Sequence, residues 1–292
     1  MDDPAFPALP FTIYPHDPLS AMFYDPIKDR LGDFFSRSPL LQRLFYGLLN
    51  LLFLRAWYVK REIRNLLGAM PGPIRVLDAG TGFGQYAYFV ARSFPHARVH
   101  AVDVKQDYLD NARRFLDQTP QGRQVDLAFD DLTQLRAEGP FDFVLSVDVM
   151  EHIEDDRAVF CNFARVLRPG GYVLVNTPSD LGGSDVGEEG DTSFIEEHVR
   201  DGYNIDELKD KLREAGLEPV RSLYTYGPYG SMAWRMLIKR PIQMLGRSYA
   251  FVVLLPLYYL FALPVGIALN AADVRRENEA GTGLIVIARK KG

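Results

Sequence analysis

Apolar residues in the central part of the chain come in short runs, and polar residues dominate the stretches between them. The short runs predict strands at 74–79, 98–103, 124–129, 141–147, 171–177 and 218–226. The stretches between them repeat apolar residues with helical spacing and predict helices at 84–93, 107–117, 154–167 and 204–215. Apolar strands that alternate with helices indicate a parallel sheet with helices on both faces. Ligands bind such sheets at the carboxyl ends of the strands.

Two apolar segments lie outside this pattern, one on each side of it. Residues 1–33 form a proline-rich arm, and residues 38–67 predict one or two helices with Pro39 in the first turn. The run 40–54 is too apolar on all sides for a simple surface helix. The second segment, 248–272, contains no charged residue and is long enough to span a bilayer, which takes about 20 residues.

The net charge of −5 is unevenly distributed along the chain. Residues 34–68 hold six Lys and Arg residues against one acid, and residues 228–272 hold four against none. These basic residues stand among apolar ones, whereas a nucleic-acid-binding surface would place them among polar ones. The pattern therefore excludes nucleic acid as the expected partner and favours a peripheral contact with a membrane surface.

The run from Val76 to Gln85 gives the clearest chemical signal. It is a strand that ends in Asp78, followed by glycines at 80, 82 and 84 and then by a helix. Glycines let the backbone turn sharply and approach a ligand, and the first N–H groups of a helix favour a carboxylate or phosphate. The spacing is G-x-G-x-G, with Gln85 in the place of the third glycine of the dinucleotide-binding pattern G-x-G-x-x-G. The loop therefore differs from that of NAD-binding enzymes.

This run resembles motif I of the class I S-adenosylmethionine (SAM)-dependent methyltransferases. Four later segments resemble further landmarks of that family, in its order and at its spacing: 99–103, 130–132, 141–152 and 167–175. The resemblance covers roughly residues 72 to 226 and a last strand at 283–290. It implies a seven-stranded, doubly wound α/β sheet of the Rossmann-like type with an antiparallel last strand. It also implies SAM as the cofactor.

The resemblance assigns the residues that hold the cofactor. Asp78 would face the amino group of its methionine part, Asp103 would hold the ribose hydroxyls, and the loop after the third strand would meet the adenine. The full set predicted to bind the cofactor is Asp78, Gly80, Thr81, Gly82, Gly84, Gln85, Asp103, Val104, Asp130, Asp131, Leu132 and Asp148.

The predicted last strand constrains the apolar segment 248–272. A single crossing of a bilayer would leave 283–290 on the far side from the strands with which it pairs, so the chain must return to the side that it left. Pro256 and Pro264 offer break points for a hairpin in the membrane interface or for a re-entrant loop. The alternative is a hydrophobic lid over the active site, or the interface of a homodimer.

Two histidines are predicted as catalytic residues on the acceptor side. His198 begins a stretch that resembles the H-x-R-x-[FY]-[ST]-x-x-E-L pattern of methyltransferases of the ubiquinone-biosynthesis type. The stretch departs from that pattern, since one extra residue separates Arg200 from Tyr203 and Asn204 replaces Ser or Thr. In the alternative interpretation, His198 is a loop residue and Asn204 caps the next helix. His152, after the fourth strand, is the second candidate.

His152 also belongs to a set with i, i+3, i+4 spacing, namely Asp148, Glu151 and His152. The set resembles the E-x-x-E-H motif of the ubiquinone O-methyltransferases, which has been linked to a divalent metal. The wider family carries Glu-His at this position without a metal. No metal is therefore predicted, and these three residues are the alternative if one is bound.

The single cysteine, Cys161, excludes an internal disulfide and is expected to be a buried apolar side chain. The first residues of the chain lack a basic stretch followed by an apolar run, so no secretory signal is expected. We therefore expect the protein in the cytoplasm, peripheral on the inner face of the membrane.

The sequence thus predicts a SAM-dependent methyltransferase for a hydrophobic acceptor such as a lipid, an isoprenoid or a quinone precursor, with O-methylation favoured by the resemblance. N- or C-methylation of a phospholipid or small molecule is the first alternative. A non-catalytic, membrane-associated partner subunit with the same fold is another. The expected parts are an N-terminal arm with helices (1–71), the core (72–227), an apolar insertion (228–280) and the last core strand (281–292).

Overall fold

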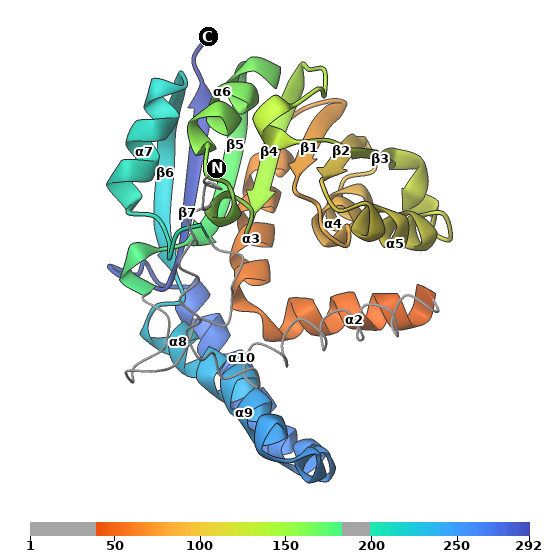
Figure 1. Ribbon diagram of the computed structural model, residues 1–292, viewed down its shortest axis with the longest axis vertical. Coiled ribbons are helices and arrows are strands. Elements are labelled where there is room, and N and C mark those ends of the chain that lie inside the picture. The colour runs from red at the N-terminus through yellow and green to blue at the C-terminus, as the bar shows by residue number, and fades with distance from the viewer. Residues whose placement is uncertain (1–38, 183–198) are drawn as a thin grey trace, which may run out of the picture.

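The computed structural model describes residues 39–182 and 199–292 (Figure 1). Seven strands form one sheet in the order β3-β2-β1-β4-β5-β7-β6. The strands are β1 (Ile74–Ala79), β2 (Ala97–Asp103), β3 (Val125–Phe129), β4 (Phe141–Val147), β5 (Leu167–Pro178), β6 (Leu217–Thr225) and β7 (Gly283–Lys290). All neighbours are parallel except those of β7, which lies antiparallel between β5 and β6. The predicted α/β fold with an antiparallel last strand is therefore confirmed.

The strands alternate their side chains between two apolar layers. The first layer is covered by α3 (Leu54–Gly68), α4 (Gln85–Ser93) and α5 (Gln106–Leu116), and the second by α6 (Asp156–Val166) and α7 (Ile205–Glu214). Val76 of β1 lies in the first layer and Leu77 in the second. Short 3₁₀ turns follow several strands: η1 (Pro120–Gln124), η2 (Leu132–Gln134), η3 (Met150–His152) and η4 (Asp180–Gly182). Burial on both faces explains why the strand sequences are apolar throughout.

The direction of the strand order reverses between β1 and β4. From β1 the chain moves outward through β2 and β3 and then returns to the other side of β1 as β4. In open α/β sheets such a reversal leaves a crevice at the carboxyl ends of the two central strands. Figure 1 shows that these ends face the side of the molecule on which α2 and the helices after β6 lie.

The N-terminal helices are α2 (Pro39–Leu52) and α3. The extended backbone of Phe53 separates them. Tyr46 of α2 is buried and packs edge-on against Phe115 of α5, with ring centroids 5.1 Å apart. Leu44 and Leu48 of the same helix are 54% and 39% exposed. The helix α2 therefore rests on the core by one side only, whereas α3 is part of the core.

The insertion between β6 and β7 is a helical hairpin. Its elements are α8 (Pro228–Trp234), a π-helical turn (Arg235–Lys239), α9 (Arg240–Arg247), a 3₁₀ turn (Tyr249–Val253) and α10 (Leu255–Val274). The chain reverses at Ser248, whose extended backbone ends α9 and whose Oγ accepts a hydrogen bond from the N–H of Ala250 at 3.2 Å. Pro256 lies in the first turn of α10, where its missing N–H removes no helical hydrogen bond, and Pro264 lies within the helix. Pro264 is therefore not a break point, whereas Pro256 marks the place where the second arm begins after the turn.

A buried carboxylate fixes the root of the hairpin to the core. Asp273, near the end of α10, accepts hydrogen bonds from the Tyr58 hydroxyl of α3 at 2.7 Å and from the N–H of Gly230 of α8 at 2.8 Å. Burial and the adjacent Asp273 carboxylate raise the pKa of Tyr58 well above its usual value, so the hydroxyl stays a neutral donor. A Cβ at position 230 would lie 2.4 Å from Cδ2 of Leu54, so only glycine fits there. The hairpin therefore leaves the core from a rigid base.

Two tyrosines hold α10 against the π-helical turn. The hydroxyl of Tyr258 donates to the carbonyl of Met236 at 2.6 Å, and that of Tyr259 to the carbonyl of Leu237 at 2.7 Å. A π-helical turn disturbs the regular helical hydrogen bonds, and these hydroxyls give its carbonyls a partner. Gly266 of α10 lies against Leu237, where a Cβ would come within 2.5 Å of Cγ. The two arms of the hairpin are thus in close contact.

Cys161 is exposed on α6, so the prediction of a buried side chain is wrong. Phe160 and Phe163 are fully buried and define the core face of that helix. Successive residues of a helix are rotated by about 100°, and this rotation carries position 161 to the solvent side.

Candidate active site

The loop after β1 is built from glycines with left-handed backbone conformations. The φ angles of Gly80, Gly82 and Gly84 are 81°, 54° and 79°. A Cβ at position 80 would lie 2.3 Å from Cγ2 of Val149, in the loop that follows β4. Conformation therefore disfavours side chains at all three positions, and space also excludes one at position 80, so the backbone of this turn stays bare beside the end of β1.

Asp78, at the end of β1, is a buried carboxylate with few partners. It is 3% exposed, and its Oδ2 accepts a hydrogen bond from the Thr81 hydroxyl at 2.7 Å. Burial raises the pKa of Asp78 to about 6; the Thr81 hydrogen bond acts in the opposite direction, and the charge of Asp103 adds to the rise. A cationic group bound beside Asp78 would relieve this unfavourable burial.

Asp103, at the end of β2, is held by backbone donors of the loops beside it. Its Oδ2 accepts from the N–H of Gly82 at 2.8 Å, and its Oδ1 accepts from the N–H of Lys105 at 2.9 Å. Each oxygen keeps a lone pair for a further donor, such as a ligand hydroxyl. The structure thus brings the two predicted anchors, Asp78 and Asp103, to the two sides of the same glycine loop.

Two other predicted cofactor residues have different surroundings. Gln85, at the start of α4, donates through Nε2 to Oδ1 of Asn50 at 2.7 Å, which joins the glycine loop to α2. The carbonyl of Phe83 in the same loop accepts a hydrogen bond from the Tyr46 hydroxyl of α2. Val104 is 54% exposed beside Asp103. The side chain of Gln85 therefore positions the loop against the N-terminal helices.

The loop after β3 lies next to the end of β2, since the N–H of Asp130 donates to the carbonyl of Asp103 at 3.2 Å. The carboxylate of Asp130 is buried and accepts from the N–H groups of Arg136 and Ala137, both at 2.9 Å, so it closes its own loop. Asp131 caps the turn η2 through the N–H of Thr133 at 2.8 Å. Leu132 is 5% exposed. Contact of Asp130, Asp131 and Leu132 with an adenine stays a prediction.

An arginine that the sequence does not single out occupies the other side of the crevice. Arg55 of α3 forms an ion pair with Asp148, directly after β4, and its backbone N–H donates to the Tyr226 hydroxyl at 3.1 Å. Asp148 and Tyr226 have φ angles of 52° and 54°, and they are the non-glycine residues with positive φ in the part of the chain that the structure describes. Strained backbone of this kind clusters at functional sites. Both strained residues contact Arg55.

Tyr86 of α4 adds an unpartnered hydroxyl to this side of the crevice. The residue is 8% exposed, and its hydroxyl has no well-formed hydrogen bond to any described residue. Burial raises the pKa of Tyr86 to about 12, while the nearby charge of Arg55 lowers it. Arg55 is the nearest polar partner of this hydroxyl, which therefore retains capacity for a further hydrogen bond. We call Arg55, Tyr86, Asp148 and Tyr226 the acceptor-side cluster.

The alternative metal set is separated in the structure. Glu151 is buried, its Oε2 accepts from the Thr177 hydroxyl at 3.1 Å, and burial raises the pKa of its carboxyl. Asp148 faces Arg55, and His152 is exposed. Among residues 39–182 and 199–292, no group of three His, Cys, Asp or Glu side chains is arranged to hold a metal ion.

His198 lies outside the described residues, so its role stays a prediction. The N–H of the next residue, Val199, donates to the carbonyl of Glu151 at 3.0 Å. Arg200 pairs with Oδ2 of Asp156 at 2.7 Å, and the Tyr203 hydroxyl donates to the same oxygen at 2.7 Å. These residues of the H-x-R pattern therefore anchor the chain beside the loop of His152.

Asn204 caps α7, as the alternative interpretation of this stretch expects. Its Oδ1 accepts from the N–H of Asp206 at 3.0 Å. The cap confirms the predicted start of the helix and leaves the function of His198 open.

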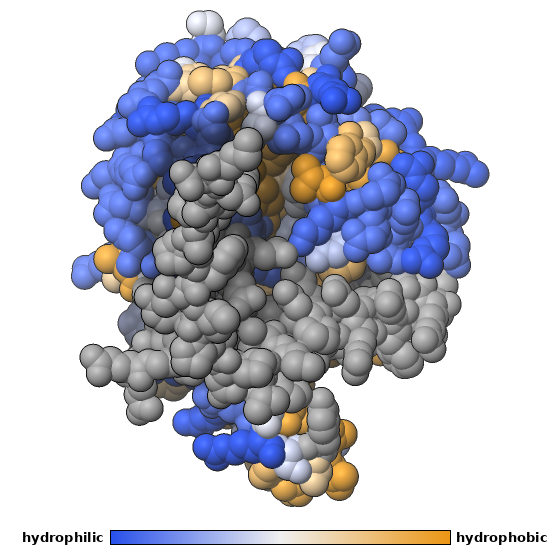
Figure 2. Space-filling model, viewed as in Figure 1, coloured by the Kyte–Doolittle hydropathy of each residue, from blue (hydrophilic) through white to orange (hydrophobic). Residues whose placement is uncertain are grey.

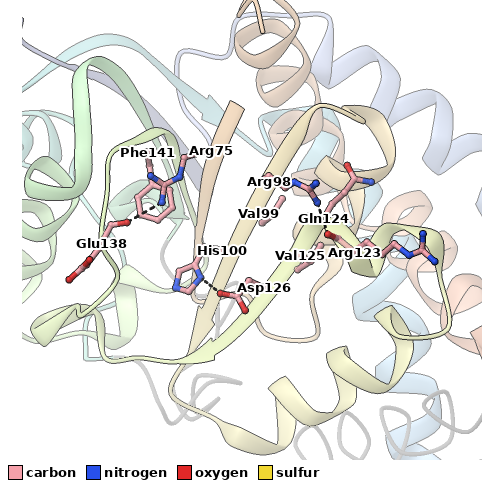
Figure 3. A pocket seen from close by; sticks show the side chains of 10 residues that line it. All are labelled: Arg75, Arg98, Val99, His100, Arg123, Gln124, Val125, Asp126, Glu138 and Phe141. Atoms are coloured by element: carbon pink, nitrogen blue, oxygen red, sulfur yellow. Dashed lines mark hydrogen bonds and ion pairs between the residues drawn. The ribbon is translucent and has the colours of Figure 1, made fainter. Parts of the chain in front are cut away.

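A separate cavity of about 410 Å³ lies at the opposite, amino ends of the strands (Figure 3). Several of its polar side chains have partners within the protein: His100 is hydrogen-bonded to Asp126 at 2.8 Å, and Arg98 donates to the carbonyl of Arg123 at 2.6 Å. The lining residues are Arg75, Arg98, Val99, His100, Arg123, Gln124, Val125, Asp126, Glu138 and Phe141. Parallel α/β sheets bind their ligands at the other end, so this cavity is not the predicted site.

Comparison with known proteins identifies the family to which the chain belongs. Residues 76–171 match a family model described as a methyltransferase domain. A ubiquinone biosynthesis O-methyltransferase of Dinoroseobacter shibae is 32% identical over 177 residues, which cover 56% of this chain and 70% of that protein. A phosphoethanolamine N-methyltransferase of wheat (Triticum aestivum) is 29% identical over 163 residues, which cover 55% of this chain but 31% of that protein. The chain thus spans about a third of the wheat relative.

The fold also occurs in solved structures. Phosphoethanolamine N-methyltransferase 2 of Haemonchus contortus, solved in complex with SAM, has a TM-score of 0.56 at 21% identity. The match covers 90% of this chain and 60% of that one, and it supports the fold. The bacterial relative is matched over more than two thirds of its length at above 30% identity. On these grounds the chain belongs to the class I SAM-dependent methyltransferase family, and the predicted cofactor, SAM, is confirmed with it.

Proposed function

We propose that this protein transfers a methyl group from SAM to a hydrophobic acceptor, with a hydroxyl oxygen as the methylated atom. One observation carries the proposal: Asp78 and Asp103 flank a glycine loop at the carboxyl ends of β1 and β2, beside the strand reversal. The residues fit the cofactor, because the buried Asp78 carboxylate suits an ammonium group and Asp103 has acceptor capacity for hydroxyls. When bound, SAM supplies a methyl group that its sulfonium charge has already activated.

The acceptor-side cluster would position the acceptor. Asp148 orients the Arg55 guanidinium, which retains N–H donors for an oxygen of the acceptor. The Tyr86 hydroxyl can donate to or accept from the same group. Fixing the acceptor oxygen in line with the methyl donor, and keeping water away, is the main contribution that a methyltransferase makes.

Methylation of a hydroxyl also requires a group that accepts its proton. His152 is the exposed residue of the turn η3 after β4, on the same side of the sheet as Asp148. His198 remains the second candidate for this role. The name of the Dinoroseobacter relative favours O-methylation of a quinone precursor, and the name of the wheat relative favours N-methylation of a phosphate-bearing amine. Arg55 would suit the phosphate of the second class, which is the alternative.

Calorimetric titration with SAM tests the cofactor site. Asp103→Ala should weaken the affinity by about 100-fold, because it removes an acceptor for charge-assisted hydrogen bonds. Asp210→Ala, an exposed aspartate of α7, is the matched control and should bind as the wild type does. Equal affinity of Asp103→Ala and the wild type would contradict the proposed site.

Incubation of a membrane lipid extract with isotopically labelled SAM, followed by mass spectrometry, tests the reaction. Transfer of the label to an apolar product is expected. Binding of SAM without any labelled product would instead favour the non-catalytic partner subunit.

A further inference from the structure

The free end of the hairpin exposes large apolar side chains. We call this set the apolar tip: Val252, Val253, Leu254, Leu257, Leu260, Phe261 and Val265, which are 50–81% exposed. Figure 2 shows the hydrophobic surface gathered at the end of the hairpin, away from the body of the protein. Single exposed apolar residues are common, but a contiguous patch of this kind marks an interaction surface.

The tip consists of the 3₁₀ turn before α10 and the first half of α10, a helix whose composition suits a membrane rather than a protein core. The 20 residues of α10 have a mean hydropathy of 1.6 over their most apolar window, and 17% of that window is buried. The buried positions, Ala262, Gly266, Asn270 and Asp273, follow one another at helical spacing along one face of α10. This face fastens the hairpin, whereas Leu257, Leu260, Phe261 and Val265 of the same helix are exposed.

The topology requires that the chain, if its apolar tip enters a bilayer, returns to the side from which it came. The root of α10 is held by Asp273, and β7 follows within the sheet, between β5 and β6. The other arm, α9, joins α8, whose Gly230 is bonded to the same Asp273. Both ends of the hairpin are therefore fixed to the core on one side, so α10 cannot cross a bilayer alone. The four basic residues of the other arm, 228–247, disfavour a second crossing beside it and favour a peripheral contact.

Positive charge accompanies the apolar tip. Arg240 and Arg247 of α9 are exposed, and residues 228–272 contain no acid. A hollow of about 550 Å³ beside them is lined by Pro228, Ser231, Met232, Arg235, Met236 and Arg240. Arginines next to exposed apolar side chains complement a surface that presents anions above hydrocarbon, as anionic lipids do.

The same charge argues against a second copy of the chain as the occupant. A symmetric contact through the hairpin would place the basic α9 of one copy near that of the other, and like charges repel. Figure 1 shows that the hairpin and α2 lie on the side toward which the carboxyl ends of the parallel strands point. Docking by the tip would therefore turn the crevice toward the lipid.

We propose that the hairpin docks this protein on the surface of a bilayer that contains anionic lipid. The apolar tip enters the boundary between headgroups and acyl chains, and Arg240 and Arg247 lie among the headgroups. Arginine can place its alkyl stem in the apolar layer and its guanidinium at the polar level, so both positions are compatible with a shallow insertion. The docking does not depend on the proposed reaction, although it would give access to a membrane-bound acceptor.

Flotation of the full-length protein with lipid vesicles tests this. Two vesicles are compared, pure phosphatidylcholine and an equimolar mixture of phosphatidylcholine with phosphatidylglycerol. The wild type should float with the mixed vesicles and bind the neutral ones at least about tenfold more weakly, because each basic residue near an anionic surface contributes to binding. Failure of the wild type to float with the mixed vesicles would overturn the proposal.

Two variants test separately how the apolar side chains of the tip and the arginines of α9 contribute to binding. Leu257→Ser with Leu260→Ser and Phe261→Ser should abolish flotation, because it removes the side chains that enter the lipid. Arg240→Glu with Arg247→Glu should reduce binding to the mixed vesicles to the level of the neutral ones. Flotation of the serine variant at the wild-type level would contradict insertion of the tip, and an unchanged charge variant would contradict its orientation.

Matched controls keep these results interpretable. Val220→Ser changes a 53% exposed valine on β6, and Arg92→Glu with Arg123→Glu reverses two exposed arginines far from the hairpin. Both controls should float as the wild type does. Circular dichroism and SAM titration verify that each variant is folded. A wild type that fails to float but sediments as a dimer, with the serine variant monomeric, would assign the tip to a second copy and overturn the docking proposal.

Discussion

Asp78 in the crevice and Asp273 at the root of the hairpin are both buried aspartates, but their surroundings differ. Asp273 accepts from Tyr58 at 2.7 Å, from Gly230 at 2.8 Å and from Asn278 at 3.3 Å. Asp78 has the Thr81 hydroxyl and the backbone of Ala87 as donors, and burial outweighs both and raises its pKa to about 6. A buried carboxylate with several donors from different elements holds the fold together. A buried carboxylate with fewer donors is stabilised when a ligand supplies a further donor or a positive charge. The contrast separates a structural site from a binding site within the same chain.

The strongest test of this contrast is removal of the Asp273 carboxylate. Asp273→Ala leaves the Tyr58 hydroxyl and the Gly230 N–H buried without an acceptor, and it should lower the free energy of unfolding by about 4 kcal/mol. Asp273→Asn keeps one acceptor oxygen and should cost about half as much. Urea unfolding followed by circular dichroism measures both values. A loss below about 1 kcal/mol for the alanine variant would show that the root is not fixed by this residue.

Removal of the Asp78 charge should raise the free energy of unfolding, whereas removal of the Asp273 carboxylate should lower it. Its pKa rises from 3.8 to about 6 on folding, so between these pH values the folded protein binds more protons than the unfolded chain. The free energy of unfolding of the ligand-free protein therefore falls as the pH rises through this window and stays lower above it. Asp78→Asn removes the ionisation and should stabilise the ligand-free protein at pH 7 by up to about 3 kcal/mol.

Thermal unfolding at pH 4 and pH 7 checks this prediction. The wild type and Asp78→Asn should differ little at pH 4 and most at pH 7. The variant should also bind SAM more weakly, since it lacks the charge that faces an ammonium group. An Asp78→Asn protein that is less stable than the wild type at pH 7 would show that the carboxylate is structural, like Asp273.

The smallest effect is expected for a substitution of Arg55, which distinguishes the acceptor-side cluster from the residues that bind the cofactor. Arg55→Lys keeps the charge beside Asp148 but loses the planar fork of donors, and it should lower the rate of methyl transfer by about tenfold. The affinity for SAM should stay within about twofold, because Arg55 belongs to the acceptor-side cluster. Incorporation of labelled methyl groups into a lipid extract measures the rate, with Arg43→Lys on α2 as the control. Equal losses of rate and SAM affinity would place Arg55 on the cofactor side instead.

The two aspartates also show how much of the structure can be predicted from the sequence. Asp78 is found because its neighbours along the chain, Gly80 and Gly84, form a local pattern with a known backbone requirement. The hydrogen bond between Tyr58 and Asp273 joins positions 215 residues apart, and neither residue lies in a motif. The sequence does not reveal the role of Arg55 either, because its partner Asp148 follows a strand far along the chain.

Local periodicity fails in a different way at Cys161 and in the hairpin. The apolar neighbours of Cys161 indicate a buried helix face, but the helix presents Phe160 and Phe163 to the core and leaves the cysteine outside. In the hairpin, the chain reverses between Ser248 and Leu254, so Pro256 begins the second arm and Pro264 lies inside it. The Ser248 hydroxyl accepts a hydrogen bond at the start of this turn, and serine is a weaker signal in the sequence than proline.

The place of β7 in the sheet has a consequence for synthesis on the ribosome. Among the described strands, β6 pairs with β7 alone, so it has no neighbour in the sheet until β7 has been made. The hairpin is translated between these two strands, and its apolar tip leaves the ribosomal exit tunnel while the edge of β5 is still open. The nascent chain therefore exposes an unpaired edge and a lipophilic loop at the same time, the combination that chaperones bind, until its final strand closes the gap.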